Sequence, residues 1–131
     1  MSTSYAIVGL GHRAHMFLHA LLGEHAAFGR LVGLCDSNPG RLAHAAEIAG
    51  DAGVSVPTYA FTDFDRMLRE TSPERVIVTV PDHAHCEYIV RALELGADVI
   101  TEKPLTIDAE SCRRIVAARQ ASGRSVTLAF N

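Results

Sequence analysis

The sequence is poor in the residues that mark secreted, disulfide-stabilised or membrane-spanning proteins. It has no tryptophan and only three cysteines, Cys35, Cys86 and Cys112, which form no C-x-x-C pair. An odd number of widely spaced cysteines is typical of reduced thiols, so we expect a cytoplasmic protein without disulfides. No apolar run reaches the roughly 18 residues of a membrane span. The first residues do not show the basic segment followed by an apolar segment that is typical of a signal peptide, so we expect none.

The sequence also lacks a large excess of charge of either sign. Lysine and arginine together number 12 and aspartate and glutamate 15, which gives a formal net charge of −3 with both signs mixed along the chain. Nucleic acids and anionic membranes attract proteins through clustered positive charge, which this sequence lacks. We therefore expect neither nucleic acid nor a membrane as a partner.

The sequence does contain enough apolar material for one packed domain. Hydrophobic residues make up 48% of the 131 residues, and a chain of this size buries roughly two-thirds of its unfolded surface on folding. It contains no linker, internal repeat or low-complexity stretch. Residues 1–131 are therefore expected to form a single domain.

Short apolar runs alternate with amphipathic segments along the whole chain. Six runs have the character of strands, at residues 5–8, 31–35, 54–59, 76–80, 99–101 and 125–130. The third run contains Pro57, which places it near a sheet edge. Five segments with helical periodicity lie between the runs: one through Ala14 and Leu22, one opened by Pro39, one capped by Thr62, one ended by Gly96, and one at residues 106–122 with Cys112, Ile115 and Val116 inward.

This alternation predicts the α/β class, as a doubly wound, mostly parallel six-stranded Rossmann sheet in the order 3-2-1-4-5-6 with helices on both faces. Such a sheet binds ligands at the carboxyl ends of its strands, where the strand order reverses. We therefore expect the functional residues directly after Val8, Cys35, Val80 and Thr101.

The turn after the first strand, Gly9-Leu10-Gly11-His12-Arg13-Ala14, has the spacing G-x-G-x-x-A. In such a turn the first glycine allows a sharp bend, the second leaves space for a pyrophosphate, and the small third residue lets the helix pack close to the sheet. Backbone N–H groups around His12 and Arg13, together with the helix dipole, favour a diphosphate. An ordinary glycine turn can have the same local sequence, so the interpretation depends on context.

Asp36 supplies that context, because it closes the second strand. A carboxylate at this place accepts hydrogen bonds from the adenosine ribose hydroxyls of a dinucleotide; the alternative is an aspartate that caps the helix beginning at Pro39. A 2′-phosphate beside this carboxylate would be repelled by up to roughly 4 kcal/mol per charge pair at an effective dielectric of about 20. NAD is therefore expected rather than NADP, although Arg41, unless it is simply a solvated helix residue, would soften the repulsion.

Two further motifs follow the fourth and fifth strands: Val80-Pro81-Asp82-His83-Ala84-His85 and Glu102-Lys103-Pro104. With the glycine turn, and with Ala92-Leu93-Glu94-Leu95-Gly96 before the fifth strand, they make essentially the whole chain resemble the N-terminal Rossmann domain of the Gfo/Idh/MocA family of oxidoreductases. Glu-Lys-Pro at this strand end, combined with the other two motifs, is more specific than any of the three by itself.

The resemblance implies that Lys103 is the family's active-site lysine, near the nicotinamide ribose and the substrate hydroxyl, which an ammonium group can orient and polarise. The alternative is a surface lysine at a strand end. Glu102 and Pro104 would position Lys103, with a cis peptide bond before Pro104. The predicted cofactor-binding set is Gly9, Gly11, His12, Arg13, Asp36, Val80, Pro81, His85, Glu102 and Lys103. For His85, a polar residue in the first turn of a helix is an equally good interpretation.

His12, His15 and His19 share one side of the first helix, which suggests a metal site. However, they flank the exposed face opposite Phe17 and Leu21, and no cysteine or second-strand carboxylate joins them. We therefore expect no metal.

The resemblance implies an NAD-dependent oxidoreductase that transfers hydride between a nicotinamide cofactor and a sugar, cyclitol or related polyol. Family members continue with a C-terminal α/β domain that carries the substrate contacts, and this domain is absent from the sequence. We expect the piece alone to be inactive, the small-molecule substrate to bind through the missing domain, and the full-length protein to form a homo-oligomer. The chain is either part of a longer protein or naturally short.

Two other functions remain open: a regulatory module that binds the dinucleotide as a signal, and a hydrolase that uses tightly held NAD to cleave glycosides. S-adenosylmethionine methyltransferases also have a glycine after the first strand. That interpretation, however, leaves Glu102-Lys103-Pro104 without a role.

Overall fold

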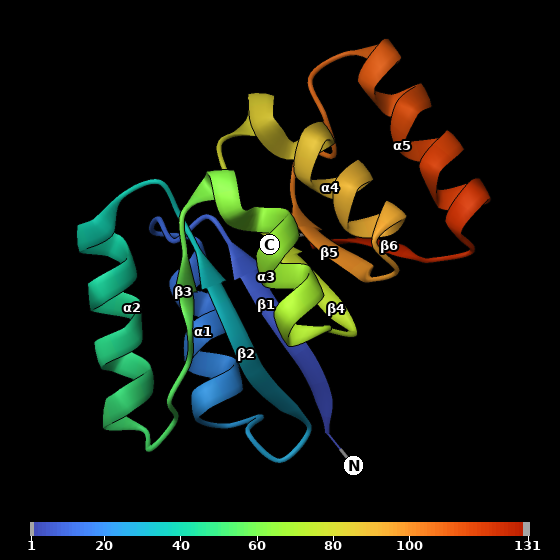
Figure 1. The fold of residues 1–131 in the computed structure, drawn as a ribbon. Helices are drawn as coiled ribbons and strands as arrows, with labels where there is room; N and C mark the ends of the chain where they lie inside the picture. Colours follow the sequence, from blue (N-terminus) through green and yellow to red (C-terminus); the bar gives the residue numbers. More distant parts are fainter. Residues whose placement is uncertain (1, 130–131) are drawn as a thin grey trace.

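The computed structural model describes residues 2–129, which form a six-stranded parallel sheet with helices on both faces (Figure 1). The strands are β1 (Thr3–Val8), β2 (Gly29–Cys35), β3 (Thr58–Tyr59), β4 (Arg75–Val78), β5 (Asp98–Glu102) and β6 (Val126–Ala129). The helices are α1 (Ala14–Leu22), α2 (Pro39–Asp51), α3 (Phe64–Thr71), α4 (His85–Glu94) and α5 (Ala109–Ser122), with 3₁₀ turns η1 (Phe61–Asp63) and η2 (Asp82–Ala84). The strand order is β3-β2-β1-β4-β5-β6, which confirms the predicted fold class.

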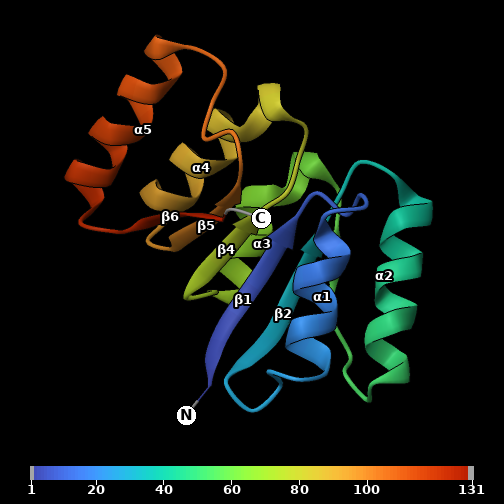
Figure 2. The same ribbon diagram turned by 180° about the vertical axis from the view of Figure 1, so that it is seen from behind.

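Helices α1 and α2 cover one face of the sheet, and α3, α4 and α5 cover the other (Figures 1 and 2). On the first face, Ile7 of β1 lies between Leu34 of β2 and Ile77 of β4, and Leu18 of α1 packs on this row. These side chains are at most 2% exposed, and each contributes about 1.5–3 kcal/mol through burial.

The second face has its own apolar core. Val78 of the central strand β4 packs with Met67 of α3 and with Ile89 and Leu93 of α4, all fully buried. Because β4 is covered on its other face by the Ile7 row, its sequence is continuously apolar rather than alternating. The two cores together fix the strand ends, where the loops of the candidate site begin.

The helix ends follow the side-chain chemistry of the chain. Asn38 caps α2, because its Oδ1 accepts hydrogen bonds from the N–H groups of Gly40 (2.8 Å) and Arg41 (3.2 Å), and Pro39 occupies the first helical position. Gly123 ends α5 in the left-handed conformation, with φ +69°. The predicted start of α2 and end of α5 are confirmed.

The third strand is shorter than predicted. Only Thr58 and Tyr59 pair with β2, whereas residues 54–57 are not in a strand. Pro57 has no N–H group to give to a ladder, and only its carbonyl is used, by the N–H of Leu34 at 3.1 Å. The fourth strand also ends earlier than predicted, at Val78. Its neighbour β1 turns away at Gly9, so Val80 lies in the loop.

Two helix starts were predicted wrongly. Thr62 caps no helix: it lies exposed inside η1, and α3 begins at Phe64. The last helix begins at Ala109 instead of residue 106, because the carboxylate of Asp108 accepts the N–H of Ser111 at 2.7 Å and caps it there.

The inward face of α5 is also narrower than predicted. Ile115 is buried at 2%, Cys112 is half-buried, and Val116 is exposed at 45%. Because α5 lies at the end of the sheet and packs mainly on α4 (Figure 1), only a thin stripe of its surface is covered. The predicted strand at residues 125–130 is β6, and Phe130 lies outside the described residues. Within residues 2–129, none of the helices has the length and apolar character needed to cross a bilayer.

Candidate functional site

Two adjoining clefts open at the carboxyl ends of β1, β2, β4 and β5, where the strand order reverses between β1 and β4. One, of about 290 Å³, follows the glycine turn to Asp36; the other, of about 510 Å³, reaches Lys103. Arg13, Thr79 and Val80 line both clefts and so mark their boundary. All residues of the predicted cofactor-binding set line one cleft or the other.

A further cleft, of about 400 Å³, lies at the opposite end of the sheet, where β4 and β5 begin. It includes Pro73, Gly96 and Asp98 but none of the predicted site residues. The two clefts at the carboxyl ends are therefore the ones that matter for the predicted chemistry.

The two motif glycines have different physical roles. Gly9 has φ +89°, and a Cβ there would lie 2.5 Å from the backbone N of Val80. Gly9 is therefore needed by the fold itself. A Cβ at Gly11 would meet no atom within 4 Å. The space beside Gly11 is open, and it is the place where a phosphate-binding turn of this type brings its ligand close to the backbone.

The start of α1 faces this open space. Arg13 is the N-cap residue, its side chain makes no capping hydrogen bond, and the first turn contains no acidic residue. The first amide groups of a helix have no partner within the helix, and the helix dipole adds positive potential there. The backbone around His12 and Arg13, both exposed, is therefore suited to hold an anion.

Asp36 is more deeply engaged in the fold than either interpretation of its sequence position predicted. Its side chain lies in the cleft wall, and the residue is only 2% exposed. Oδ2 accepts the N–H of Leu10 at 2.6 Å, and Oδ1 accepts the N–H of Asn38 at 2.8 Å. Asn38, not Asp36, caps α2. Each carboxylate oxygen has a second lone pair, so Asp36 can still accept hydrogen bonds from a ligand.

His85 is the first residue of α4, yet its ring is not a solvated polar group of that turn. The residue is 1% exposed, with Nδ1 2.7 Å from the carbonyl oxygen of Pro104 and Nε2 3.0 Å from that of Val80. Both ring nitrogens thus face backbone carbonyls. The position in the first turn of a helix is confirmed, and the ring turns inward between two loops.

The Glu102-Lys103-Pro104 segment leaves the end of β5 at the second cleft. The Glu102 side chain is 7% exposed and pairs with the guanidinium of Arg13, whose Nη2 lies 3.2 Å from Oε1 and 3.3 Å from Oε2. Lys103 is exposed and lines the cleft. It is also the only lysine in the sequence, where every other side-chain cation besides histidine is an arginine. The peptide bond between Lys103 and Pro104 is cis, as predicted.

Sequence reasoning missed several residues of the clefts. Thr79 ties the β4 end to the glycine turn, because its hydroxyl donates to the carbonyl of Gly9 at 2.6 Å. A polar residue at the end of a valine-rich strand was the available signal. The half-buried ring of Phe61 and the exposed residues Ser37 and Asp82 also line the clefts. Their placement depends on loops whose shape no local pattern specifies.

The histidine cluster of α1 reaches α2 through His15. The ring of His15 lies 6.1 Å from that of His19 and 5.6 Å from that of His44 of α2, between centroids. Burial, and then the positive charges of His44, His19 and His12, lower the pKa of His15. Within residues 2–129, no group of three or more histidine, cysteine, aspartate or glutamate side chains is arranged to hold a metal ion.

The parallel sheet, the glycine turn with open space beside Gly11, and the acidic residue at the end of β2 define a dinucleotide-binding Rossmann domain. The model of the oxidoreductase family with an NAD-binding Rossmann fold, Gfo/Idh/MocA, matches residues 3–130, and the chain belongs to this family. The family predicted from the sequence motifs is confirmed.

Two curated relatives align along nearly the whole chain. The chain is 36% identical over 124 residues to the putative oxidoreductase YteT of Bacillus subtilis, covering 94% of this chain and 29% of YteT. It is 32% identical over 129 residues to inositol 2-dehydrogenase 1 of Saccharopolyspora erythraea, covering 98% of this chain and 36% of that enzyme. The chain thus spans about a third of the length of these relatives.

A solved structure gives the same fold. The WlbA dehydrogenase from Chromobacterium violaceum, in complex with NADH and UDP-GlcNAcA, superimposes with a TM-score of 0.86 at 29% identity. The match covers 98% of this chain and 35% of that dehydrogenase. The fold is therefore that of an oxidoreductase's nucleotide-binding part.

Proposed function

We propose that NAD(H) binds along the two clefts and that the protein carrying this domain is an NAD-dependent oxidoreductase acting on a hydroxyl group of a sugar, cyclitol or related polyol. The observation that carries the proposal is the placement of Lys103, which lines the same cleft as Arg13 of the phosphate-binding turn. When bound, the nicotinamide ring supplies the hydride acceptor. The residues of this chain bind and orient the reactants.

The first cleft fits the adenosine diphosphate half of the cofactor. The backbone amides at the start of α1 hold the diphosphate over the open space beside Gly11. Asp36, at the wall of this cleft, accepts the ribose hydroxyls through lone pairs that Leu10 and Asn38 leave available. A carboxylate there repels a 2′-phosphate, so NAD is preferred over NADP.

The second cleft holds the reacting end, where Lys103 acts on the substrate. Its ammonium donates a hydrogen bond to the substrate oxygen and so orients the carbon that gives up hydride. Arginine cannot release a proton in a protein, whereas lysine can both hold and pass one at Nζ. This distinction supports a chemical role for the single lysine of a sequence with 12 lysine and arginine residues in total.

The substrate class comes from the relatives. One relative is an inositol 2-dehydrogenase, and inositol is a cyclitol. A similar structure is that of a dehydrogenase in complex with UDP-GlcNAcA, which is a sugar derivative. Because relatives are about three times as long as this chain, we place the substrate contacts and the acid–base residue in a C-terminal α/β domain outside it. A cytoplasmic homo-oligomer is part of the same proposal.

The test is a titration of the full-length protein with NADH, followed by fluorescence. Gly11→Val should abolish binding, because its side chain fills the open space beside the turn. Gly50→Val is the matched control, since Gly50 of α2 also has no neighbour within 4 Å but lies away from the clefts. Equal NADH binding by Gly11→Val and wild type contradicts the binding mode.

Lys103→Met separates the enzyme from the alternatives. It should leave NADH binding within about threefold while reducing the oxidation of polyols by at least about a hundredfold, a scale typical of lost positioning or acid–base groups. Full activity in this variant contradicts the assignment of Lys103. Glycoside cleavage without net NADH formation would instead identify the hydrolase.

A further inference from the structure

The two residues that flank Lys103 are each held by a side chain from the start of a helix, α1 or α4. The Glu102 carboxylate receives the guanidinium of Arg13, which lies 89 residues away at the start of α1. The carbonyl of Pro104 faces Nδ1 of His85 at 2.7 Å, from the first residue of α4. Lys103 therefore sits on a short segment that is anchored on both sides, while its own side chain remains exposed in the cleft.

The Arg13 contact joins the two clefts. Arg13 lines both, and its side chain is 49% exposed, whereas that of its partner Glu102 is only 7% exposed. A carboxylate so deeply covered requires a partner, because an unpaired buried charge is costly. The backbone of Arg13 belongs to the turn that faces the diphosphate. The same residue thus connects the cofactor-binding turn with the end of β5.

The His85 contact joins the two loops around the second cleft. The buried ring spans from the carbonyl of Val80, after β4, to that of Pro104, after β5. A carbonyl oxygen only accepts, so each contact is a hydrogen bond when the facing nitrogen carries a hydrogen. Because His85 is only 1% exposed, water has little access to the ring and cannot easily replace either contact.

We infer that Arg13 and His85 are positioning residues for Lys103, acting through Glu102 and Pro104. This inference rests on the proposed catalytic role of Lys103. The physical reason is that a long, flexible lysine side chain reaches the substrate oxygen correctly only if its backbone is fixed. Misplacement of a reacting group by about 1 Å costs on the order of a hundredfold in rate. Both residues stabilise the lysine's place without touching the reacting atoms.

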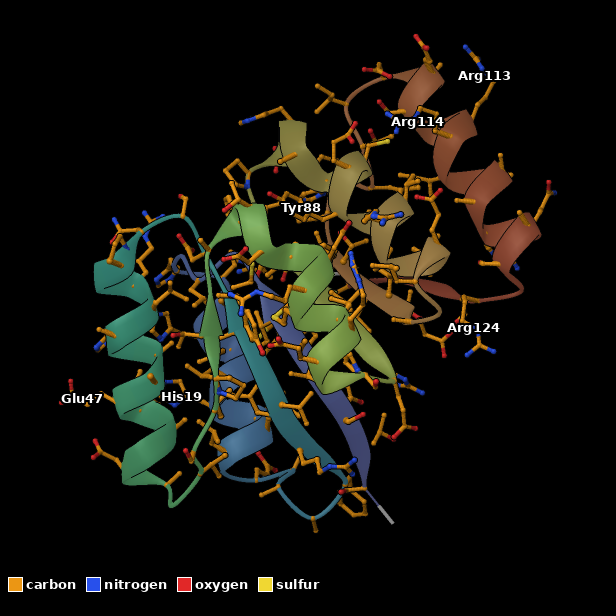
Figure 3. The ribbon with its side chains drawn as sticks, viewed as in Figure 1. His19, Glu47, Tyr88, Arg113, Arg114 and Arg124 are labelled. Carbon is orange, nitrogen blue, oxygen red and sulfur yellow. The ribbon has the colours of Figure 1, made fainter. Side chains whose placement is uncertain are left out.

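The first experiment compares turnover with cofactor affinity in the full-length protein. Arg13→Met and His85→Gln should lower kcat by on the order of 10- to 100-fold and leave the Kd for NADH within about threefold. Arg13→Lys should recover part of kcat, because it restores a positive charge beside the Glu102 carboxylate. The matched control is Arg113→Met, since Arg113 is exposed and points away from the sheet on α5 (Figure 3).

The second experiment observes Lys103 directly, without turnover. Reductive methylation with ¹³C-formaldehyde labels lysine side chains, and the dimethylamine signal of Lys103, the single lysine of residues 1–131, is assigned by its absence in Lys103→Met. Its NMR resonance should shift and sharpen in Arg13→Met and His85→Gln, which release the segment, and stay unchanged in Arg113→Met. Thermal melts accompany each variant; if His85→Gln does not fold, the half-exposed Arg13 carries the test.

The outcomes separate this inference from the proposed function. If Lys103→Met is fully active, the proposed function fails and the positioning role fails with it. If Lys103→Met is inactive but Arg13→Met keeps wild-type kcat and an unchanged Lys103 resonance, only the positioning role is overturned. A loss of NADH affinity as large as the loss of kcat/KM also overturns it, because the residues would then act through cofactor binding.

Discussion

The carboxylate of Asp36 accepts a hydrogen bond from the backbone N–H of Leu10 at 2.6 Å, joining the end of β2 to the glycine turn after β1. Its second oxygen accepts the N–H of Asn38, the residue that caps α2. One acidic side chain therefore fixes the phosphate-binding turn and the entry to the next helix at the same time. In the proposed function it also receives the ribose, so fold and ligand depend on the same group.

The first prediction concerns this carboxylate. Asp36→Asn keeps the shape but directs an NH₂ group at one of the two N–H donors, so one buried amide loses its acceptor. We expect the free energy of unfolding to fall by about 1–3 kcal/mol, measured by urea denaturation without cofactor, and the preference for NADH over NADPH to narrow in titrations. Asp51→Asn, at the exposed end of α2, is the control. Unchanged stability would show that the contact to Leu10 contributes nothing.

The second prediction concerns Gly9. An alanine Cβ there would lie 2.5 Å from the backbone N of Val80 and 2.6 Å from the carbonyl of Thr79, and φ is +89°. The unfavourable φ alone costs on the order of 1–3 kcal/mol, so Gly9→Ala should destabilise the protein by more than this in urea titrations. Gly50→Ala in α2 meets no atom within 4 Å and should stabilise by about 0.4–1 kcal/mol. Equal midpoints for both variants would contradict the structure.

The third prediction concerns pH. Because the folded state lowers the pKa of His15 below its ordinary value of 6.5, the unfolded chain binds this proton more readily. The contribution of His15 to the free energy of unfolding is therefore greatest above pH 6.5. It is lost as the pH falls from 6.5 through the lower pKa of the folded state. His15→Gln should flatten this loss between about pH 7 and pH 5 in thermal melts. His25→Gln, in the loop after α1, should leave it unchanged, and a slope that persists in His15→Gln would assign it elsewhere.

The fourth prediction concerns thiol reactivity. Burial, with the negative charges of Asp36 and Asp63 adding to it, raises the pKa of Cys35 to about 12. The reactive form is the thiolate, so Cys35 should not react with iodoacetamide at pH 8 in the native protein. Cys112, half-buried on α5, should react first. Mass spectrometry of the labelled peptides before and after denaturation measures this; rapid native labelling of Cys35 would mean that the β2 end opens.

The fold was predictable because its signals are local. Continuous valine in β4, the apolar stripe of α1 and the glycine at the end of α5 each act within a few residues, and they fixed the order of elements. The errors occurred where a competing contact won. Asp108 caps α5 ahead of the predicted start, and Pro57 shortens β3 because it has no N–H to pair.

Most of the residues that line the two clefts could be predicted from the sequence, but their contacts could not. The glycine turn and Glu102-Lys103-Pro104 are contiguous motifs, so their residues could be named from the sequence, and the structure brings them to adjoining clefts. His85 was predicted as a cofactor-side residue or a polar residue of a helix's first turn, and neither interpretation predicted that its ring would lie between two backbone carbonyls. No periodicity predicts that direction, since it depends on where two loops end.

The sequence by itself determined that glycine, acidic and lysine residues directly follow the strands. The alternation of strand and helix placed the carboxyl ends of those strands at one edge of the sheet. Tertiary structure alone decided the pairing of Arg13 with Glu102, across 89 residues, and of Leu10 with Asp36, across 26. The reason is physical: backbone patterns depend on neighbours along the chain. Long polar side chains choose partners only after packing of the strands has brought distant loops within hydrogen-bond reach.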